Sequence, residues 1–379
     1  MSNLLDYAQS VGDLTYWEKP FDTFDALFFS QIIYMPFDDF LSPSAQCTLL
    51  EAWHYLKKHS YPDKFADPYQ KKRYDLLAAC APLQRYHNVL LQNYVNEVDP
   101  SIDMQFCACT FQVSSGVQCI AYSGTDLTVA GWKEDANMAY MTVIPAQAES
   151  LVYLQARIEE NKRPTVLCGH SKGGNLALFS ASLLQQPLQE SITNVYCFDG
   201  PGVSDTIATS EGYAAILPKT ISILPQSSIV GLLLSYPPNY NVVKSDSFGV
   251  WQHDVFSWQI KNGDFCYKTD VSGHAMFRNI TINSWLNNLT PEERQFFVQT
   301  LMTLIDATNA SVVSDISDDL QGSWRKVMGA LDTLPEKDKV KMKQLFNDLL
   351  KKGAQESMKG ILSLFPSRPS ANTPEPEQA

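Results

Sequence analysis

The spacing of apolar residues changes near residue 100, and this change divides the chain into two parts. Residues 1–100 show helical spacing with no strand of note, and they predict helices over 24–34, 45–58 and 74–96. From residue 103 onward, apolar or alternating runs predict a hairpin of two strands over 104–113 and 117–122. The pattern therefore predicts a helical N-terminal segment that precedes a sheet.

Strand-like and helix-like segments alternate after this hairpin. Pro145 suits the first turn of a helix over 145–160, and apolar residues recur along one face of that segment. Strands are expected at 165–168, 194–198 and 220–224, with a helix at 175–184, and strand or turn structure is expected at 263–267 and 272–278. Such alternation is typical of parallel βαβ units, so we predict the α/β class with a mostly parallel sheet.

The last part of the chain has a different pattern. Amphipathic helices are expected at 291–307, 320–334 and 338–350, and residues 366–379 have too few apolar positions to fold. The expected organisation is a helical N-terminal segment over 1–100 packed on the core, an α/β core over 101–310, a helical extension over 311–365 and a disordered tail over 366–379.

Composition narrows the choice of partners and compartment. The 379 residues carry a formal net charge of −12, which argues against nucleic acid as a partner. The chain has no apolar run of about eighteen residues, so no membrane span is expected, and its first residues lack the features of a secretory signal. Its eight cysteines form no CxxC pair and are expected to be small buried hydrophobes, with no metal or cofactor. We expect a cytoplasmic protein.

The segment Gly169–Gly173 fits the pattern G-x-S-x-G between an expected strand and an expected helix. This context is typical of a nucleophile elbow, in which small neighbours let a strand turn sharply into a helix. The alternative is a glycine-rich turn that holds an ordinary serine. We favour Ser171 as a nucleophile.

A serine nucleophile needs a base and an orienting acid, which in hydrolases follow the serine in the order acid, then histidine. Of the two later histidines, His253 lies in a turn-rich segment and is favoured over His274. Asp199 directly follows an expected strand and is favoured as the acid, with Asp246 as the alternative and a turn-forming role for Asp199 also open. His170 is expected to pack under the turn.

Two backbone N–H groups should hold the oxyanion that forms during acyl transfer. One should come from Lys172, which follows the nucleophile, and the other from Thr125, which follows an expected strand. An ordinary β-turn at Thr125 is the alternative.

These motifs make the chain resemble the lipases of the α/β-hydrolase superfamily, in particular the class 3 (fungal-type) lipases. The matching segments are the strand and Gly-Thr turn at 120–125, the elbow Gly169–Gly174, and 196–198 with Gly200 and Pro201. Over residues 1–310 the chain more closely resembles an uncharacterised, mostly bacterial lipase-like family, which shares 126–135, 199–202, 228–231 and 252–254. In class 3 lipases the acid lies in the segment that corresponds to 227–231, where this chain has Ser228. Either Asp199 or Asp246 substitutes, or the triad is incomplete.

The resulting hypothesis is a serine hydrolase that cleaves carboxylic esters, with acyl lipids as one substrate class. A catalytically inactive scaffold that binds a lipid or protein partner is the alternative, and a peptidase or thioesterase on the same fold is a third reading. The nearly uncharged segment 220–243 could line an acyl pocket or form a lid, or it could be a buried strand with a packed loop.

Overall fold

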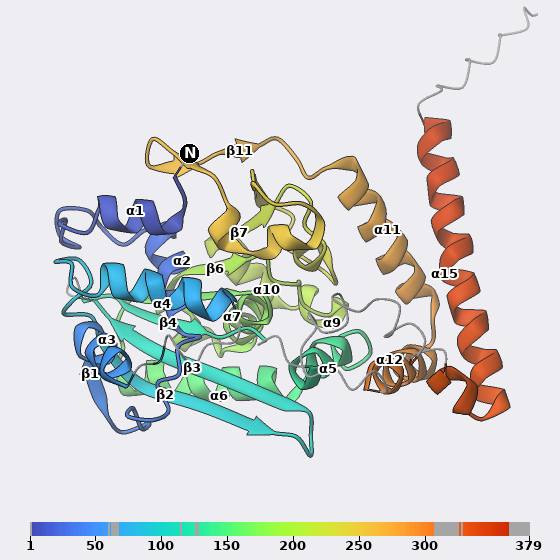
Figure 1. Ribbon diagram of the computed structural model, residues 1–379, viewed down its shortest axis with the longest axis horizontal. Helices are drawn as coiled ribbons and strands as arrows, with labels where there is room; N and C mark the ends of the chain where they lie inside the picture. Colours follow the sequence, from blue (N-terminus) through green and yellow to red (C-terminus); the bar gives the residue numbers. More distant parts are fainter. Residues whose placement is uncertain are drawn as a thin grey trace, which may run out of the picture.

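A mixed nine-stranded sheet forms the centre of the computed structural model, which describes residues 2–59, 61, 68–113, 116–125, 129–306, 326 and 329–363 (Figure 1). The strands run in the order β1 (Gln46–Thr48), β2 (Leu90–Asp99), β3 (Met104–Gln112), β4 (Gln118–Tyr122), β5 (Thr165–His170), β6 (Ile192–Phe198), β7 (Thr220–Pro225), β8 (Tyr240–Val243) and β11 (Tyr267–Lys268). Strands β4 to β8 are parallel, and antiparallel strands extend the sheet at both edges. A separate short hairpin joins β9 (Ile260–Lys261) to β10 (Asp264–Phe265).

Helices cover both faces of this sheet. Cys119 and Ala121 of β4 belong to a buried cluster with the N-terminal helices, whereas the alternate residues Ile120 and Tyr122 belong to a cluster on the opposite face. The first face carries α1 (Leu4–Ser10), α2 (Thr23–Ile32), α3 (Leu49–Lys58) and α4 (Pro68–Cys80). The second carries α6 (Pro145–Glu160), α7 (Lys172–Leu183), α8 (Gln186–Gln189), α9 (Asp205–Ala208) and α10 (Glu211–Ile216). Together these layers form an α/β fold with a mostly parallel sheet, as predicted.

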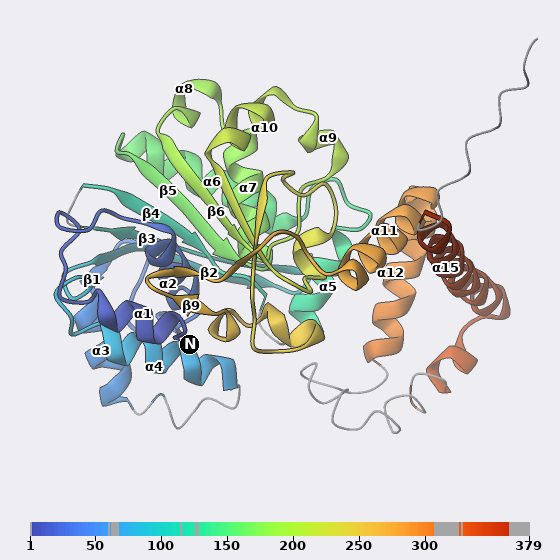
Figure 2. The ribbon, with the colours of Figure 1, turned by 90° about the horizontal axis from the view of Figure 1, so that it is seen from above.

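The C-terminal helices pack together beside the core, next to helix α5 (Val129–Asn137) (Figure 2). They are α11 (Gly273–Asn288), α12 (Pro291–Asp306) and α15 (Glu336–Ser363). Trp285, Phe297 and Met342 belong to their shared buried cluster, and Ala136 of α5 and Tyr140, three residues after its end, pack against it. Helix α5 therefore connects the C-terminal helices to the sheet. None of the described helices is long and apolar enough to span a membrane.

Several predicted elements are confirmed. The hairpin of β3 and β4, the helix over 145–160 and the parallel strands β5, β6 and β7 all occur. Six of the eight cysteines are buried, as expected of small apolar side chains. The helix expected at 320–334 falls largely outside the described residues, and the tail over 366–379 falls wholly outside them.

Three predictions are wrong. The N-terminal part contains strands β1 and β2, so the helix expected over 74–96 ends at Cys80 and a strand begins at Leu90. Residues 273–288 form helix α11 rather than strand or turn structure. The segment 220–243 contains two paired parallel strands, β7 and β8, with a short 3-10 helix, η3 (Val230–Leu232), between them, rather than a single strand with a loop.

Candidate active site

Ser171 lies on the turn between strand β5 and helix α7, with φ 58° and ψ −131°. Such a positive φ is costly for a residue with a side chain and is found where the surrounding structure imposes it. The glycines on either side make the turn possible. A Cβ at Gly169 would collide with the backbone of Gly173, and a Cβ at Gly173 would collide with the carbonyl oxygen of Tyr122. The predicted strand, sharp turn and helix are all present.

Asp199 occupies the equivalent place on the neighbouring strand. His170 of β5 pairs with Phe198 of β6, so Ser171 and Asp199 each directly follow one of two paired residues. Asp199 also has a positive φ, 45°, and is only 1 % exposed. Its Oδ2 atom lies 2.7 Å from Nδ1 of His253, which is the last residue of the 3-10 helix η4 (Gly249–His253).

The other oxygen of the Asp199 carboxylate is held by two donors. The Ser228 hydroxyl donates to Oδ1 at 2.5 Å, and the backbone N–H of Gly231 donates to the same atom at 3.2 Å. Ser228 thus lies at the position where the lipase resemblance expects the acid, and there it contacts the carboxylate that neighbours His253. The sequence did not reveal this role for Ser228.

The two alternative residues are elsewhere. The Asp246 carboxylate accepts a hydrogen bond from the side chain of Gln259, and Asp246 makes no contact with His253 among the hydrogen bonds and ion pairs of the described residues. His274 belongs to helix α11, and its side chain lies outside the part that the structure describes.

The loop that carries His253 is fixed by hydrogen bonds on several sides. His170 Nε2 donates to the carbonyl oxygen of His253 at 2.8 Å, and the two imidazole rings lie with their centroids 4.4 Å apart. Trp258 Nε1 donates to the Gln252 carbonyl at 2.8 Å, and the Gln252 side chain accepts from the Ser227 N–H at 2.8 Å. Because a carbonyl can only accept, His170 carries its proton on Nε2. His170 therefore does more than pack under the turn.

Burial lowers the pKa of His170 well below its usual value, and the neighbouring His253 adds to this effect. His170 is consequently neutral near pH 7. His253 is 29 % exposed, so a substrate and solvent can reach it. Among the hydrogen bonds of the described residues, none joins Ser171 to His253, and free hydrolases commonly hold this contact loosely before substrate binds.

The segments that carry the candidate oxyanion donors lie against Ser171. A Cβ at Gly124 would be 3.1 Å from Cβ of Ser171, so the backbone that leads into Thr125 borders the serine. The Tyr34 hydroxyl fixes this approach, since it accepts from the Gly124 N–H at 2.9 Å and donates to the His170 carbonyl at 3.3 Å. The backbone N–H groups of Thr125 and Lys172 have no hydrogen-bond partner within the described part of the chain. Within the described residues, nothing occupies either donor.

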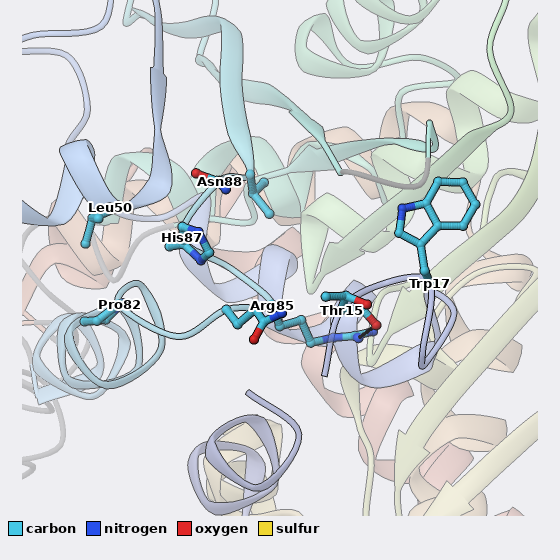
Figure 3. A pocket seen from close by; sticks show the side chains of 9 residues that line it. Thr15, Trp17, Leu50, Pro82, Arg85, His87 and Asn88 are labelled. Carbon is cyan, nitrogen blue, oxygen red and sulfur yellow. Dashed lines mark hydrogen bonds between the residues drawn. The ribbon is translucent and has the colours of Figure 1, made fainter. Parts of the chain in front are cut away.

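A surface hollow of about 630 Å³ lies at the opposite edge of the sheet (Figure 3). It is bordered by Val89, which directly precedes β2, and the register of β2, β3 and β4 puts that end of β2 beside the start of β4 rather than its end. Its lining residues are Thr15, Trp17, Leu50, Pro82, Gln84, Arg85, His87, Asn88 and Val89. This hollow is therefore separate from the candidate site. Among the described residues, no cluster of His, Cys, Asp or Glu side chains could hold a metal ion.

The mostly parallel sheet with its flanking helices and the sharp elbow at Ser171 define an α/β protein with a candidate hydrolase site. The chain belongs to the Mbeg1-like family, whose family model matches residues 80–303, more than half of the chain. A solved structure, described as the crystal structure of M37 lipase, is similar at 18 % identity and a TM-score of 0.32, and the match covers 55 % of this chain and 68 % of that one. A search of the curated proteins found no match.

Proposed function

We propose that this protein is a serine hydrolase that cleaves carboxylic esters with Ser171, His253 and Asp199 as its catalytic triad. The observation that carries the proposal is the 2.7 Å contact between Asp199 and His253 at the edge of the sheet where the Ser171 elbow opens. A carboxylate on Nδ1 fixes the imidazole tautomer and leaves Nε2 free to accept the serine proton. Asp246 has no comparable contact, which favours Asp199 as the acid.

The proposed reaction has two halves. Ser171 Oγ bonds to the ester carbonyl carbon while its proton passes to His253 Nε2, and the carbonyl electron pair moves to the oxygen, which the Thr125 and Lys172 N–H groups bind. The adduct then expels the alcohol, which takes the proton from His253 and leaves an acyl-enzyme. Water repeats the same sequence on the acyl-enzyme and releases the carboxylic acid.

The first prediction tests the nucleophile. Ser171→Ala should reduce hydrolysis of p-nitrophenyl butyrate to background, because the attacking oxygen is removed, while the protein stays folded. Ser182→Ala is the matched control, since Ser182 is a buried serine of the same helix whose hydroxyl bonds only to Leu178 O among the described residues. Equal activity in Ser171→Ala and the parent would contradict the proposal and favour the inactive scaffold. The same assay with a thioester and a peptide anilide separates the esterase from the thioesterase and peptidase readings.

Exposed aromatic residues support apolar acyl esters as the substrate class. Phe248 is 84 % exposed and Trp251 is 56 % exposed, and both lie within five residues of His253. We expect Phe248→Ser/Trp251→Ser to lower activity on an emulsified long-chain ester relative to activity on soluble p-nitrophenyl butyrate. Trp17→Ser, at an exposed aromatic on the hollow of Figure 3, should leave this ratio unchanged. An equal loss on both esters would argue against a role in acyl binding.

A further inference from the structure

Two adjacent carboxylates of helix α5 contact the two residues that carry the candidate oxyanion donors. Glu134 Oε2 lies 2.6 Å from Lys172 Nζ. Both carboxylate oxygens of Asp135 lie within 2.8 Å of the Thr125 hydroxyl oxygen, which donates to them. We propose that Glu134 and Asp135 are positioning residues that set the placement of the Lys172 and Thr125 N–H groups around the oxyanion. This inference rests on the proposed function and assigns a part of its site.

The Glu134 carboxylate is buried and hydrogen-bonded to several neighbouring segments. The carboxylate is fully buried, the Lys172 side chain is only 1 % exposed, and Lys172 Nζ also donates to the Gln105 carbonyl at 2.8 Å. The Gln105 N–H donates to Glu134 Oε2 and the Ala146 N–H donates to Oε1, each at 3.1 Å. Strand β3, helix α6 and the elbow therefore meet at a single carboxylate. A shift of α5 relative to the elbow would separate buried charges, which is costly.

The Asp135 contact acts on the other donor. Thr125 follows strand β4, and its hydroxyl bond to Asp135 ties this loop to α5 across ten residues of chain. Desolvation raises the pKa of Asp135, while the Lys172 charge and the Thr125 hydrogen bond act against that rise. The preceding residue, Gly124, is held separately by Tyr34. Side-chain and backbone contacts together thus fix the direction of the Thr125 backbone.

The chemical reason for such anchoring is the short range of the oxyanion contact. Donor nitrogens must lie about 2.7–3.1 Å from the developing oxyanion to stabilise it. A displacement of about 1 Å can reduce the rate by about 100-fold. Glu134 and Asp135 are consecutive residues of helix α5. The Lys172 and Thr125 N–H groups are therefore both positioned by contacts with the same helix.

The decisive variant removes the buried ion pair without leaving a lone charge. In Glu134→Gln/Lys172→Met both charges are lost together, a change that is often close to neutral for stability. We expect kcat for p-nitrophenyl butyrate to fall by about 10- to 100-fold with little change in KM, since the contact is made in the transition state. The inhibition constant of a trifluoromethyl ketone, whose adduct with serine carries an oxyanion, should rise by a similar factor.

Two control variants distinguish the positioning of the oxyanion donors from a general effect on the stability of the fold. Asp25→Asn/Arg85→Met removes a second buried ion pair, also 2.6 Å long, in the N-terminal helical layer, and should leave kcat per titrated active site unchanged. Asp135→Asn keeps an acceptor for the Thr125 hydroxyl and should retain most activity, whereas Asp135→Ala should lose about tenfold or more. In the double variant Thr125→Val/Asp135→Ala the loss should equal that of Asp135→Ala alone.

Three results would overturn the positioning roles of Glu134 and Asp135. Parental kcat and parental ketone affinity in Glu134→Gln/Lys172→Met, with Ser171→Ala inactive, would overturn the positioning roles and leave the proposed function standing. A loss of activity that is matched by a loss of titratable active sites would assign the ion pair a structural role and would also overturn the proposal. If Ser171→Ala hydrolyses the ester as the parent does and the parent does not bind the ketone, the proposed function fails and this inference fails with it.

Discussion

Two buried ion pairs, one in the N-terminal helical layer and one at the elbow, have the same length and nearly the same burial. The Asp25–Arg85 pair and the Glu134–Lys172 pair each measure 2.6 Å, and all four side chains are at most 3 % exposed. Their surroundings differ. The Arg85 guanidinium also donates to a set of backbone carbonyls, those of Leu14, Thr15, Lys19 and Pro20. The Asp25–Arg85 pair therefore also satisfies backbone carbonyl groups of the segment 14–20.

At the elbow, the ion pair lies beside a backbone donor that has no partner among the described residues. The side-chain charges of Glu134 and Lys172 neutralise each other, and that donor is the backbone N–H of Lys172. Ser171 and Asp199 also adopt positive φ angles there. A buried ion pair alone is weak evidence of either stability or function. The backbone strain at Ser171 and Asp199 therefore sets the surroundings of the elbow pair apart from those of the N-terminal pair.

The substitution with the largest expected effect on kcat lies in the candidate site. Asp199→Asn should lower kcat by about 10⁴, because an amide favours the wrong tautomer of His253. Asparagine tolerates a positive φ, so the variant should fold. Asp246→Asn is the matched control and should change kcat little. Steady-state kinetics on p-nitrophenyl butyrate measure both, and the reverse ranking would contradict the assignment of the acid.

The second substitution removes one partner of the N-terminal ion pair and should affect the free energy of unfolding. Asp25→Asn should lower the free energy of unfolding by about 3–5 kcal/mol, since it leaves the buried Arg85 charge without its partner. Urea denaturation measures this loss, and active-site titration should give an unchanged kcat for the molecules that remain folded. A large loss of kcat per folded molecule would mean that the N-terminal layer also shapes the site.

The smallest effect concerns His170. Its folded-state pKa is lowered, so the unfolded chain binds a proton that the folded protein excludes. The free energy of unfolding should therefore fall as the pH drops below about 6.5, by up to about 1.4 kcal/mol per pH unit from this residue. His170→Gln keeps a donor for the His253 carbonyl and cannot be protonated, so its stability should depend less steeply on pH. Identical pH profiles of the two proteins would show that His170 is not buried in its neutral form.

The parallel strands β4 to β7 could be predicted because they are short apolar runs with clear boundaries. Strand β2 could not, because it contains an irregularity. Asn93 has φ 56°, and the register with β3 shifts between Gln92 and Val95. This bulge puts the buried residues Leu91 and Tyr94 three positions apart, a spacing that is typical of a helix. The prediction of a helix up to Asn96 followed from this spacing.

The candidate site was predictable where it depends on local sequence and not where it depends on long-range pairing. The elbow at Ser171 needs only five consecutive residues with their flanking strand and helix. Asp199 and His253 are 54 residues apart, and the sequence left Asp246 open because loop contacts do not follow from spacing. Glu134 and Lys172 are 38 residues apart and Ser228 and Asp199 are 29 apart, so only the fold brings these side chains together.

Covalent labelling of the purified protein shows whether Ser171 is an activated nucleophile. A fluorophosphonate reacts only with a serine that a base has activated, and peptide mapping by mass spectrometry locates the adduct. We expect one adduct, on the peptide that contains Ser171, at a rate that falls sharply in His253→Ala. A parent protein without an adduct, or with an adduct that persists in Ser171→Ala, would contradict it.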